Sequence, residues 1–321
     1  MRLSIVVPVY NVEKYLERCI RSLLNQDIPH SDYEIRIIND GTKDGSLAIA
    51  ERLSAEYANV SVTSQANKGL SGARNTGLRE VTGTYVWFVD SDDSIEANCL
   101  GHLLETMERR NLDTCHIGFT HLFNDGSTRG YLPPEGSDAE VLDGQTFFSR
   151  FYTVPTAWSF VHRTEFLRQH QLTFFEGIVH EDEEFLPRML FACGRIASLR
   201  KSLYVYYENT ASIMGTRNLK SDLDKCRVLD SFRDFLKGNT VSETFRDRLN
   251  FRAFVLFQTV LHPSGFYRLS AEDQSRLLAR LQETAFYPIP AIAGLNTKFK
   301  LYRGLMNLNL TWYPRIRKRI G

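Results

Sequence analysis

The sequence lacks the signatures of several common cofactor and nucleophile sites. No two of its 20 glycines stand two positions apart and none precedes a lysine, which excludes the G-x-G-x-x-G dinucleotide turn and the G-x-x-x-x-G-K phosphate loop. It contains no G-x-S-x-G nucleophile elbow, and His180-Glu181 begins H-E-x-x-E instead of the H-E-x-x-H of zinc proteases. A ligand must therefore be bound by other means.

Long hydrophobic runs and paired cysteines are also missing. The longest stretch without a charged residue, Ala253–Tyr267, has 15 residues, whereas a membrane-spanning helix needs about 20 apolar residues. The apolar run before Pro8 is too short for a secretory leader. The five cysteines show no C-x-x-C spacing, which favours reduced thiols over disulfides or a zinc site. We therefore expect a soluble, cytoplasmic protein.

Neither sign of charge is in excess. The 39 basic and 38 acidic residues give a net charge of +1, so the charge balance does not indicate a nucleic-acid partner. The 43% of hydrophobic residues and 24% of charged residues are typical of a folded globular chain. A length of 321 residues predicts about two domains. We expect a first domain over residues 1–215 and a helical region over 216–321.

The first 110 residues alternate between strand and helix patterns. The predicted strands are Leu3–Val9, Glu34–Asn39, Val60–Thr63 and Tyr85–Asp90, and the helices follow Asn11, or begin near Ser46, Ser71 and Glu96. Asn11 is expected to cap the first helix. The alternation predicts an α/β fold, Rossmann-like, with a mostly parallel sheet covered by helices on both faces.

The pattern changes after residue 113. Thr114–Phe123 and Ser127–Leu132 flank Asn124-Asp125-Gly126, which predicts a β-hairpin. A helix is predicted from Phe185 to Cys193, where Pro187 is acceptable only in the first turn. A tyrosine-rich strand is predicted at Leu203–Tyr207, and helices follow from about Lys220.

The last stretch is basic. No acidic residue follows Glu283, and seven basic residues do. A helical face can be formed by Phe299, Tyr302, Leu305 and Met306. Two interpretations remain open: peripheral contact with an anionic membrane surface, or a solvated helix packed on its own domain.

An acidic group follows the strand that ends near residue 90. Asp90-Ser91-Asp92-Asp93 places three carboxylates within four residues, at the end of a strand where α/β proteins bind ligands. Such carboxylates repel one another unless a cation is present, and Mg²⁺ or Mn²⁺ prefers one or two carboxylates together with phosphate oxygens. The alternative is a favourable interaction with the N-terminus of the helix expected at Glu96.

Two further segments indicate nucleotide binding. Asp40 ends a predicted strand and can accept a hydrogen bond from a base or ribose, although Asp40-Gly41 is also a common turn signal. Residues 65–77 combine three glycines with Lys68 and Arg74 ahead of a helix. Their backbone N–H groups and cations suit a diphosphate, and the alternative is a glycine-rich loop that closes onto the sheet.

These segments occur in a characteristic order. They are Ser4-Ile-Val-Val-Pro-Val-Tyr-Asn11, Asn39-Asp-Gly-Thr-Lys-Asp-Gly-Ser46, Asn67-Lys-Gly-Leu-Ser-Gly-Ala-Arg-Asn75 and Val89-Asp-Ser-Asp-Asp93. The arrangement resembles the family 2 glycosyltransferases, which have the GT-A fold. A fifth segment, His180-Glu-Asp-Glu-Glu-Phe185, is similar to the E-D-x-x-F motif of members that build bacterial surface polysaccharides, and extends the resemblance to about residue 215.

The resemblance implies a role for each matching residue. Pro8, Tyr10 and Asn11 would border the nucleotide base, Asp40 would contact it, Arg74 would lie near the diphosphate, and Asp90 and Asp92 would touch the ribose and the divalent metal. Lys68 and Arg74 can stabilise the charge of the departing diphosphate. Asp182 would be the general base of an inverting transfer, in preference to Glu181, which is a weak candidate for acceptor contact. The alternative for Glu181 and its neighbours Glu183 and Glu184 is a solvated acidic turn.

The sequence thus predicts transfer of a sugar from a UDP-sugar to a glycan or lipid-linked acceptor, with Mn²⁺ or Mg²⁺ as cofactor. Trp158 and the tyrosines at 204, 206 and 207 are candidates for stacking on the acceptor sugar, with sheet packing as the alternative. A second hypothesis is a catalytically inactive, nucleotide-binding scaffold of a polysaccharide assembly complex. A sugar nucleotidylyltransferase would need a glycine-rich loop where Val9-Tyr10-Asn11 stands.

Overall fold

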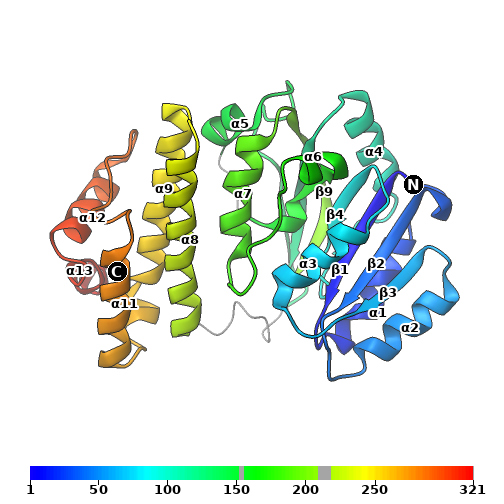
Figure 1. The fold of residues 1–321 in the computed structure, drawn as a ribbon, viewed down its shortest axis with the longest axis horizontal. Coiled ribbons are helices and arrows are strands. Elements are labelled where there is room, and N and C mark those ends of the chain that lie inside the picture. Colours follow the sequence, from blue (N-terminus) through cyan, green and yellow to red (C-terminus); the bar gives the residue numbers. More distant parts are fainter. Residues whose placement is uncertain (152–154, 209–217, 321) are drawn as a thin grey trace. The chain divides into compact units, whose positions relative to one another are not determined.

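The computed structural model describes residues 1–151, 155–208 and 218–320. The chain forms two compact units, drawn in one ribbon in Figure 1. The first comprises Met1–Gly177 and Arg188–Thr210, and the second comprises Ile178–Pro187 and Ala211–Gly321. The boundary predicted between residues 215 and 216 lies outside the described residues. The segment Ile178–Pro187, which the sequence analysis placed in the first domain, groups with the second unit.

The first unit begins with a parallel sheet. Its strands β1 (Leu3–Val9), β2 (Tyr33–Asn39), β3 (Val60–Ser64) and β4 (Tyr85–Phe88) lie in the order β3-β2-β1-β4. All seven residues of β1 are buried, which explains its continuous apolar sequence. These four strands confirm the predicted α/β alternation.

Three helices connect these strands and a fourth follows β5 (Ser94–Ile95). The first residues of two of the four helices differ from the prediction. The helices are α1 (Glu13–Leu24), α2 (Ser46–Glu56), α3 (Gly69–Glu80) and α4 (Leu100–Arg109). Val12, and not Asn11, occupies the N-cap of α1. The helix expected at Glu96 begins only at Leu100 because Ser94–Ile95 forms the short strand β5, which pairs with β9.

The sheet continues beyond residue 113 with strands of both directions. The hairpin of β6 (Thr114–Leu122) and β7 (Thr128–Tyr131) is confirmed, and β8 (Phe160–Arg163) joins it to β4 in antiparallel pairing. The strand β9 (Ile196–Tyr207) runs parallel to β6 and is longer than expected. The expectation of a mostly parallel sheet is therefore correct for the first four strands and for the β6–β9 pair, whereas β5, β7 and β8 pair in antiparallel fashion. Short helices α5 (Gly144–Arg150) and α6 (Thr164–Gln169) complete this part.

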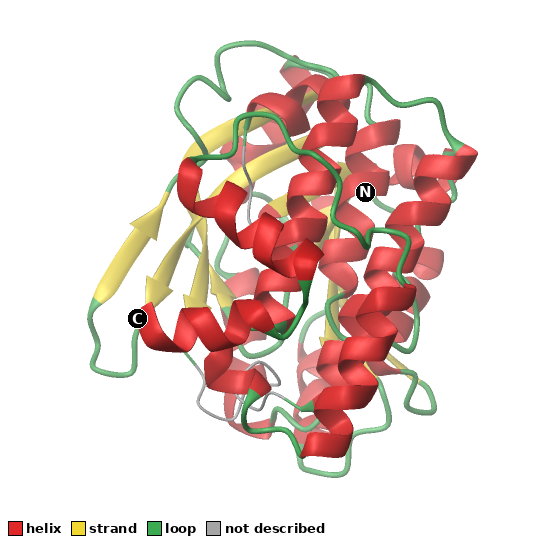
Figure 2. Cartoon of the chain, turned by 90° about the vertical axis from the view of Figure 1, so that its left-hand side faces the viewer, coloured by secondary structure: helices red, strands yellow, loops and turns green. Residues whose placement is uncertain are grey.

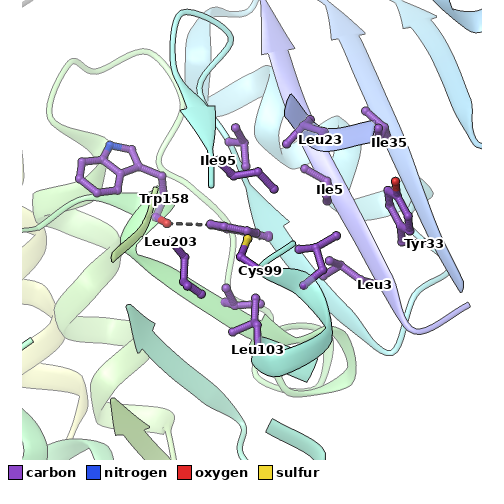
Figure 3. Packing of buried hydrophobic residues seen from close by; sticks show 14 of the residues in the cluster. Leu3, Ile5, Leu23, Tyr33, Ile35, Ile95, Cys99, Leu103, Trp158 and Leu203 are labelled. Atoms are coloured by element: carbon purple, nitrogen blue, oxygen red, sulfur yellow. Dashed lines mark hydrogen bonds between the residues drawn. The ribbon is translucent and has the colours of Figure 1, made fainter. Parts of the chain in front are cut away.

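A single hydrophobic cluster joins the parallel and mixed parts of the sheet. Figure 3 shows part of this cluster, in which side chains from β1, β2, α1 and α4 meet Trp158 and Leu203. The indole N–H of Trp87 donates to the Trp158 carbonyl oxygen at 2.7 Å. Burying these side chains stabilises the sheet by roughly 1.5–3 kcal/mol for each large apolar group.

The described residues of the second unit form helices and loops, and helices are red in Figure 2. It contains α8 (Leu219–Gly238), α9 (Glu243–Val260), α10 (Pro263–Phe266), α11 (Ala271–Glu283), α12 (Thr297–Leu308) and α13 (Trp312–Ile320). Ser242, Ser270 and Asn296 each cap a helix by accepting a backbone hydrogen bond. In the described residues, no helix combines the length and apolar character needed to cross a membrane.

The division between the units falls inside α7 (Glu181–Ala192), between Pro187 and Arg188. The expectation that Pro187 lies in the first turn is wrong, since the helix begins four residues earlier than the predicted Phe185. The acidic residues at 181–184 form the first turn instead, as expected from the preference of carboxylates for a helix N-terminus.

Candidate functional site

The carboxyl ends of β2, β1 and β4 lie side by side at one edge of the sheet. The chain passes from β1 to β2 and β3 on one side, and then returns to place β4 on the other side of β1. A reversal of this kind opens a crevice beyond the strand ends, where α/β proteins bind their ligands. Asp40 follows β2, Tyr10 and Asn11 follow β1, and Asp90 lies just beyond β4. The sheet therefore brings the predicted nucleotide-binding segments together.

An ion pair joins α3 to the end of β4. The Arg74 guanidinium donates to Asp90 Oδ1 at 2.7 Å, and it also lies 5.1 Å from the ring centroid of Phe174. The Arg74 side chain is 1% exposed and that of Asp90 is 26% exposed. The pair has no net charge, but it fixes a guanidinium, a group suited to binding phosphate oxygens, beside the acidic loop.

The third carboxylate of the acidic group has a structural role that the sequence analysis missed. Asp93 is buried, and its two oxygens accept hydrogen bonds from the Tyr204 hydroxyl at 2.5 Å and from the Tyr207 backbone N–H at 2.9 Å. Burial raises the pKa of Asp93 well above its ordinary value, and the charges of Asp92 and Asp90 raise it further. Asp93 therefore anchors the loop after β4 to β9, and Asp90 and Asp92 are the more accessible pair.

Arg18 on α1 fixes the same loop from the other side, and the sequence analysis also missed it. Its guanidinium lies 3.4 Å from the ring centroid of Tyr207 and donates to the backbone carbonyl oxygen of Asp92 at 2.5 Å. The cation thus lies within the acidic segment without neutralising a carboxylate directly. Nothing in the local sequence distinguishes Arg18 from the other charged residues of an amphipathic helix.

Asp40 organises the glycine-rich loop before α3. Its Oδ1 accepts hydrogen bonds from the Gln65 side chain at 2.7 Å and from the backbone N–H of Lys68 at 2.8 Å. Asp40 is buried, whereas Lys68 is exposed at the N-cap of α3. The predicted contact between Asp40 and a base remains a prediction, and the loop-forming alternative is observed.

The turn after β1 is linked to the loop after β2. Asn11 has a left-handed backbone with a φ of 54°, and its Oδ1 accepts from the Lys43 N–H at 2.8 Å. Asp44 accepts hydrogen bonds from Ser46, Thr42 and the Glu13 N–H. Burial raises the pKa of Asp44, but these hydrogen bonds outweigh it and lower the pKa to about 2. The turn therefore presents Tyr10, which is 46% exposed, from a rigid backbone, while Pro8 is buried within β1.

Asp90 and Asp92 are the residues of the acidic loop that would hold a divalent cation shared with a diphosphate. Asp90 and Asp92 are partly exposed carboxylates two residues apart, and their charges contribute to the raised pKa of the neighbouring Asp93. Such crowding of negative charge is relieved by a hard cation. The described residues contain no cluster of three or more protein ligands, so ligand oxygens would complete the coordination. The interpretation of Asp92 and Asp93 as the start of a helix is wrong, because α4 begins at Leu100.

The predicted base lies in the second compact unit. Asp182 is the second residue of α7 and is partly exposed, whereas Glu181 and Glu184 are buried. Glu184 accepts from Ser231 Oγ at 2.6 Å, and Glu183 pairs with Arg252. The alternative of a solvated acidic turn is therefore wrong, because these carboxylates join α7 to α8 and α9.

Trp158 is part of the core. Its ring is 6% exposed and stacks on Tyr204, with centroids 4.3 Å apart and an interplanar angle of 7°. A ring covered in this way has no open face for a sugar, and sheet packing accounts for it. Tyr206 and Tyr207 are partly exposed at the end of β9.

The fold is the GT-A fold, and together with the motifs it defines a class of enzymes that transfer sugars from nucleotide donors. The family model Glycosyl transferase family 2 matches residues 4–167, just over half of the chain, and the chain belongs to this family. It is 37% identical over 217 residues to EpsJ of Bacillus subtilis, an uncharacterized glycosyltransferase. That match covers 65% of this chain and 62% of EpsJ, so the chain spans less than two thirds of this relative's length.

Solved structures share the fold at low sequence identity. TarS 1–349 of S. aureus in complex with UDP-GlcNAc superposes with a TM-score of 0.78 at 20% identity, over 99% of this chain and 91% of the other. The mannosyltransferase PcManGT of Pyrobaculum calidifontis in complex with GDP-Man and Mn²⁺ gives a TM-score of 0.56 at 14% identity, over 99% and 87% of the two chains. The predicted GT-A fold is confirmed.

Proposed function

We propose that this protein is an inverting, metal-dependent glycosyltransferase. It moves a sugar from a UDP-sugar to a hydroxyl of a glycan or lipid-linked acceptor in the synthesis of a surface polysaccharide. Membership of glycosyl transferase family 2 supports the reaction type. UDP-GlcNAc bound to TarS and Mn²⁺ bound to PcManGT support the donor and the cofactor.

The observation that carries the proposal is the pairing of Arg74 with Asp90 beside Asp92. The pair lies at the edge of the sheet where the strand order changes direction. The loops after β1 and β2 begin at the same edge. A UDP-sugar presents a base, a ribose and a diphosphate in sequence. We assign Pro8, Tyr10, Asn11 and Asp40 to the base, Asp90 to the ribose, and Arg74 and Lys68 to the diphosphate.

In the proposed reaction one bond forms as another breaks. The acceptor oxygen attacks C1 of the donor sugar, and UDP leaves from the opposite face with the electrons of the C1–O bond. Arg74 and Lys68 stabilise the negative charge that develops on the leaving diphosphate. A Mn²⁺ or Mg²⁺ ion held by Asp92 supplies further charge stabilisation when bound. Asp182 accepts the proton of the acceptor hydroxyl, and a base in this position contributes about 10²–10⁴-fold to the rate.

The predicted cytoplasmic location and the weak assignment of Glu181 to acceptor contact stay predictions. We assign peripheral membrane contact to the basic residues after Glu283, because a lipid-linked acceptor would be presented at a membrane surface.

The experiment is UDP release from a panel of UDP-sugars with Mn²⁺ or Mg²⁺, together with calorimetric binding of UDP. Asp182→Asn should lower the rate of sugar transfer by about 10²-fold or more and leave UDP affinity unchanged. The matched control is Asp234→Asn, an exposed carboxylate of α8 in the same unit. A protein that binds UDP but releases none from any donor, with Asp182→Asn indistinguishable, would instead support the inactive scaffold.

A further inference from the structure

Helix α12 carries two apolar stripes, and only one of them is buried. Tyr302 and Met306 are 3% and 0% exposed and pack inside the helical unit. Leu301, Leu305 and Leu308 follow an i, i+4, i+7 spacing and share another face of the helix. Leu301 is 54% exposed and Leu308 is 72% exposed. This leucine stripe is exposed at both ends, and Leu305 between them is partly buried.

Other exposed apolar side chains occur in the same part of the sequence. Of the eight large hydrophobic residues that are exposed in the described chain, four are Tyr267, Leu301, Leu308 and Trp312. A single exposed leucine is common, whereas several exposed apolar residues on neighbouring elements are typical of an interaction surface, and α13 packs against both α10 and α12. Trp312 begins α13, and tryptophan favours the boundary between water and lipid.

A groove of about 520 Å³ lies within the helical unit and is lined in part by α12. Its walls come from α9, α10, α12 and α13: Val255, Gln258, Thr259, His262, Ser264, Lys298, Phe299, Tyr302, Tyr313 and Arg317. The lining combines aromatic rings with two permanent cations and contains no carboxylate. The groove is therefore both apolar and positively charged.

The two cations meet on one aromatic ring. Lys298 Nζ lies 5.8 Å and the Arg317 guanidinium 5.6 Å from the centroid of Tyr302, and Arg317 donates to the Tyr302 hydroxyl at 3.0 Å. Among the described residues neither forms a salt bridge, and no acidic residue follows Glu283. Two cations near the same ring, in a groove without a carboxylate in its lining, favour the binding of an anion in the groove.

Lys298 connects the groove to the leucine stripe. At about 100° of rotation per residue, Lys298 lies about 60° from Leu301 around α12, on the side of Tyr302. A ligand that binds in the groove through an anionic group would therefore place the apolar segment next to that group along the leucine stripe. An anionic phospholipid has this arrangement, with a phosphate next to the acyl boundary.

We propose that α12 and α13 dock on an anionic phospholipid surface. The lipid phosphate enters the groove between Lys298 and Arg317, and Leu301, Leu305 and Leu308 enter the acyl boundary. The inference names the surface and the lipid chemistry of the membrane contact included in the proposed function, and it does not depend on glycosyl transfer.

The test is sedimentation of the full chain with vesicles of phosphatidylcholine alone or with phosphatidylglycerol added, in the absence of donor. We expect binding only to the anionic vesicles. Lys298→Ala with Arg317→Ala should weaken it by about tenfold or more and reduce its salt dependence. Leu301→Gln with Leu308→Gln changes only exposed positions and should weaken it by a similar factor.

The matched control is Lys237→Ala with Arg246→Ala, which removes two exposed positive charges elsewhere in the helical unit. Equal binding to neutral and anionic vesicles, or equal losses in the control and the groove variant, would overturn the proposal. So would displacement of the protein by inorganic phosphate at constant ionic strength, since the groove would then be a site for a free anion. UDP release with a soluble acceptor should be unchanged in all of these variants, which separates a failure of docking from a failure of the proposed reaction.

Discussion

The Arg74 guanidinium and the Asp90 carboxylate form a 2.7 Å ion pair in which the cation is buried and the anion is partly accessible. Arg74 comes from the middle of α3 and Asp90 from the end of β4. The pair therefore fixes the helix that follows the glycine-rich loop against the acidic loop. The structural role of this pair and its proposed role in donor binding can be separated by experiment.

A double-mutant cycle on Arg74 and Asp90 should give a coupling energy of about 1–3 kcal/mol in chemical denaturation. Asp90→Asn leaves an almost fully buried guanidinium without the charge of Asp90, whereas Arg74→Met leaves a carboxylate that is 26% exposed, so the cost of Asp90→Asn should be the larger. UDP affinity should fall in both variants. Additive effects in the cycle would mean that the pair does not stabilise the fold.

Asp92→Asn should act on metal-supported binding and not on stability. We expect kcat/KM to fall by about 10²-fold or more, because one group that stabilises developing charge is lost. UDP affinity should respond to Mn²⁺ in the parent protein and not in the variant. Asp138→Asn, an exposed surface change in the same unit, is the control. Retention of the Mn²⁺ response by Asp92→Asn would exclude this residue as the metal ligand.

Asp93 should behave as a structural residue. Asp93→Ala removes the acceptor of the Tyr204 hydroxyl and the Tyr207 N–H, and should lower the free energy of unfolding by about 2–4 kcal/mol. Asp93→Asn keeps one acceptor oxygen and should cost less. Tyr204→Phe should cost about 1–2 kcal/mol. Denaturation curves measure all three, and an Asp93→Ala variant as stable as the parent would contradict the anchoring role.

Gly77 should be required for the close packing of α3 on β1. A Cβ at Gly77 would lie 2.3 Å from Val6 Cγ1, so Gly77→Ala should lower the free energy of unfolding by about 1–3 kcal/mol. Gly304 in α12 has no atom within 4 Å of such a Cβ. Gly304→Ala should therefore raise the free energy of unfolding by about 0.5–1 kcal/mol. Thermal melts of the two variants should shift in opposite directions; a shared direction would refute the packing argument.

Two buried histidines should make the fold sensitive to acid. Burial lowers the pKa of His116 and of His162 to about 3, from an ordinary value of 6.5. Below pH 6.5 the unfolded chain therefore binds protons that the folded chain does not, so stability falls as the pH falls. Between pH 6 and 5 these two imidazoles contribute a loss of about 2 kcal/mol, measured by tryptophan fluorescence in denaturant. His116→Asn should remove about 1 kcal/mol of that loss, and an unchanged slope would show that His116 is not responsible.

Much of the fold and of the site was predictable from local sequence. The burial of β1 on both faces requires seven consecutive residues that tolerate an apolar environment, so Leu3–Val9 is recognisable by itself. Asp40 and Asp90 were identified because each follows such a strand. The errors arose where a distant partner decides the structure. Glu96 is not helical because Ser94 and Ile95 pair with residues more than 100 positions away in β9.

Local sequence therefore determined the alternation of strands and helices, the position of the acidic loop and the membership of a family, because burial and turn formation depend on neighbours along the chain. Tertiary structure alone decided which of the three carboxylates in the acidic loop is buried, since only the fold brings Tyr204 to Asp93. It also decided which of the two apolar faces of α12 is packed, the one with Tyr302 and Met306, and which one is exposed. Long-range packing selects among side chains that are chemically alike, and a local pattern does not contain that selection.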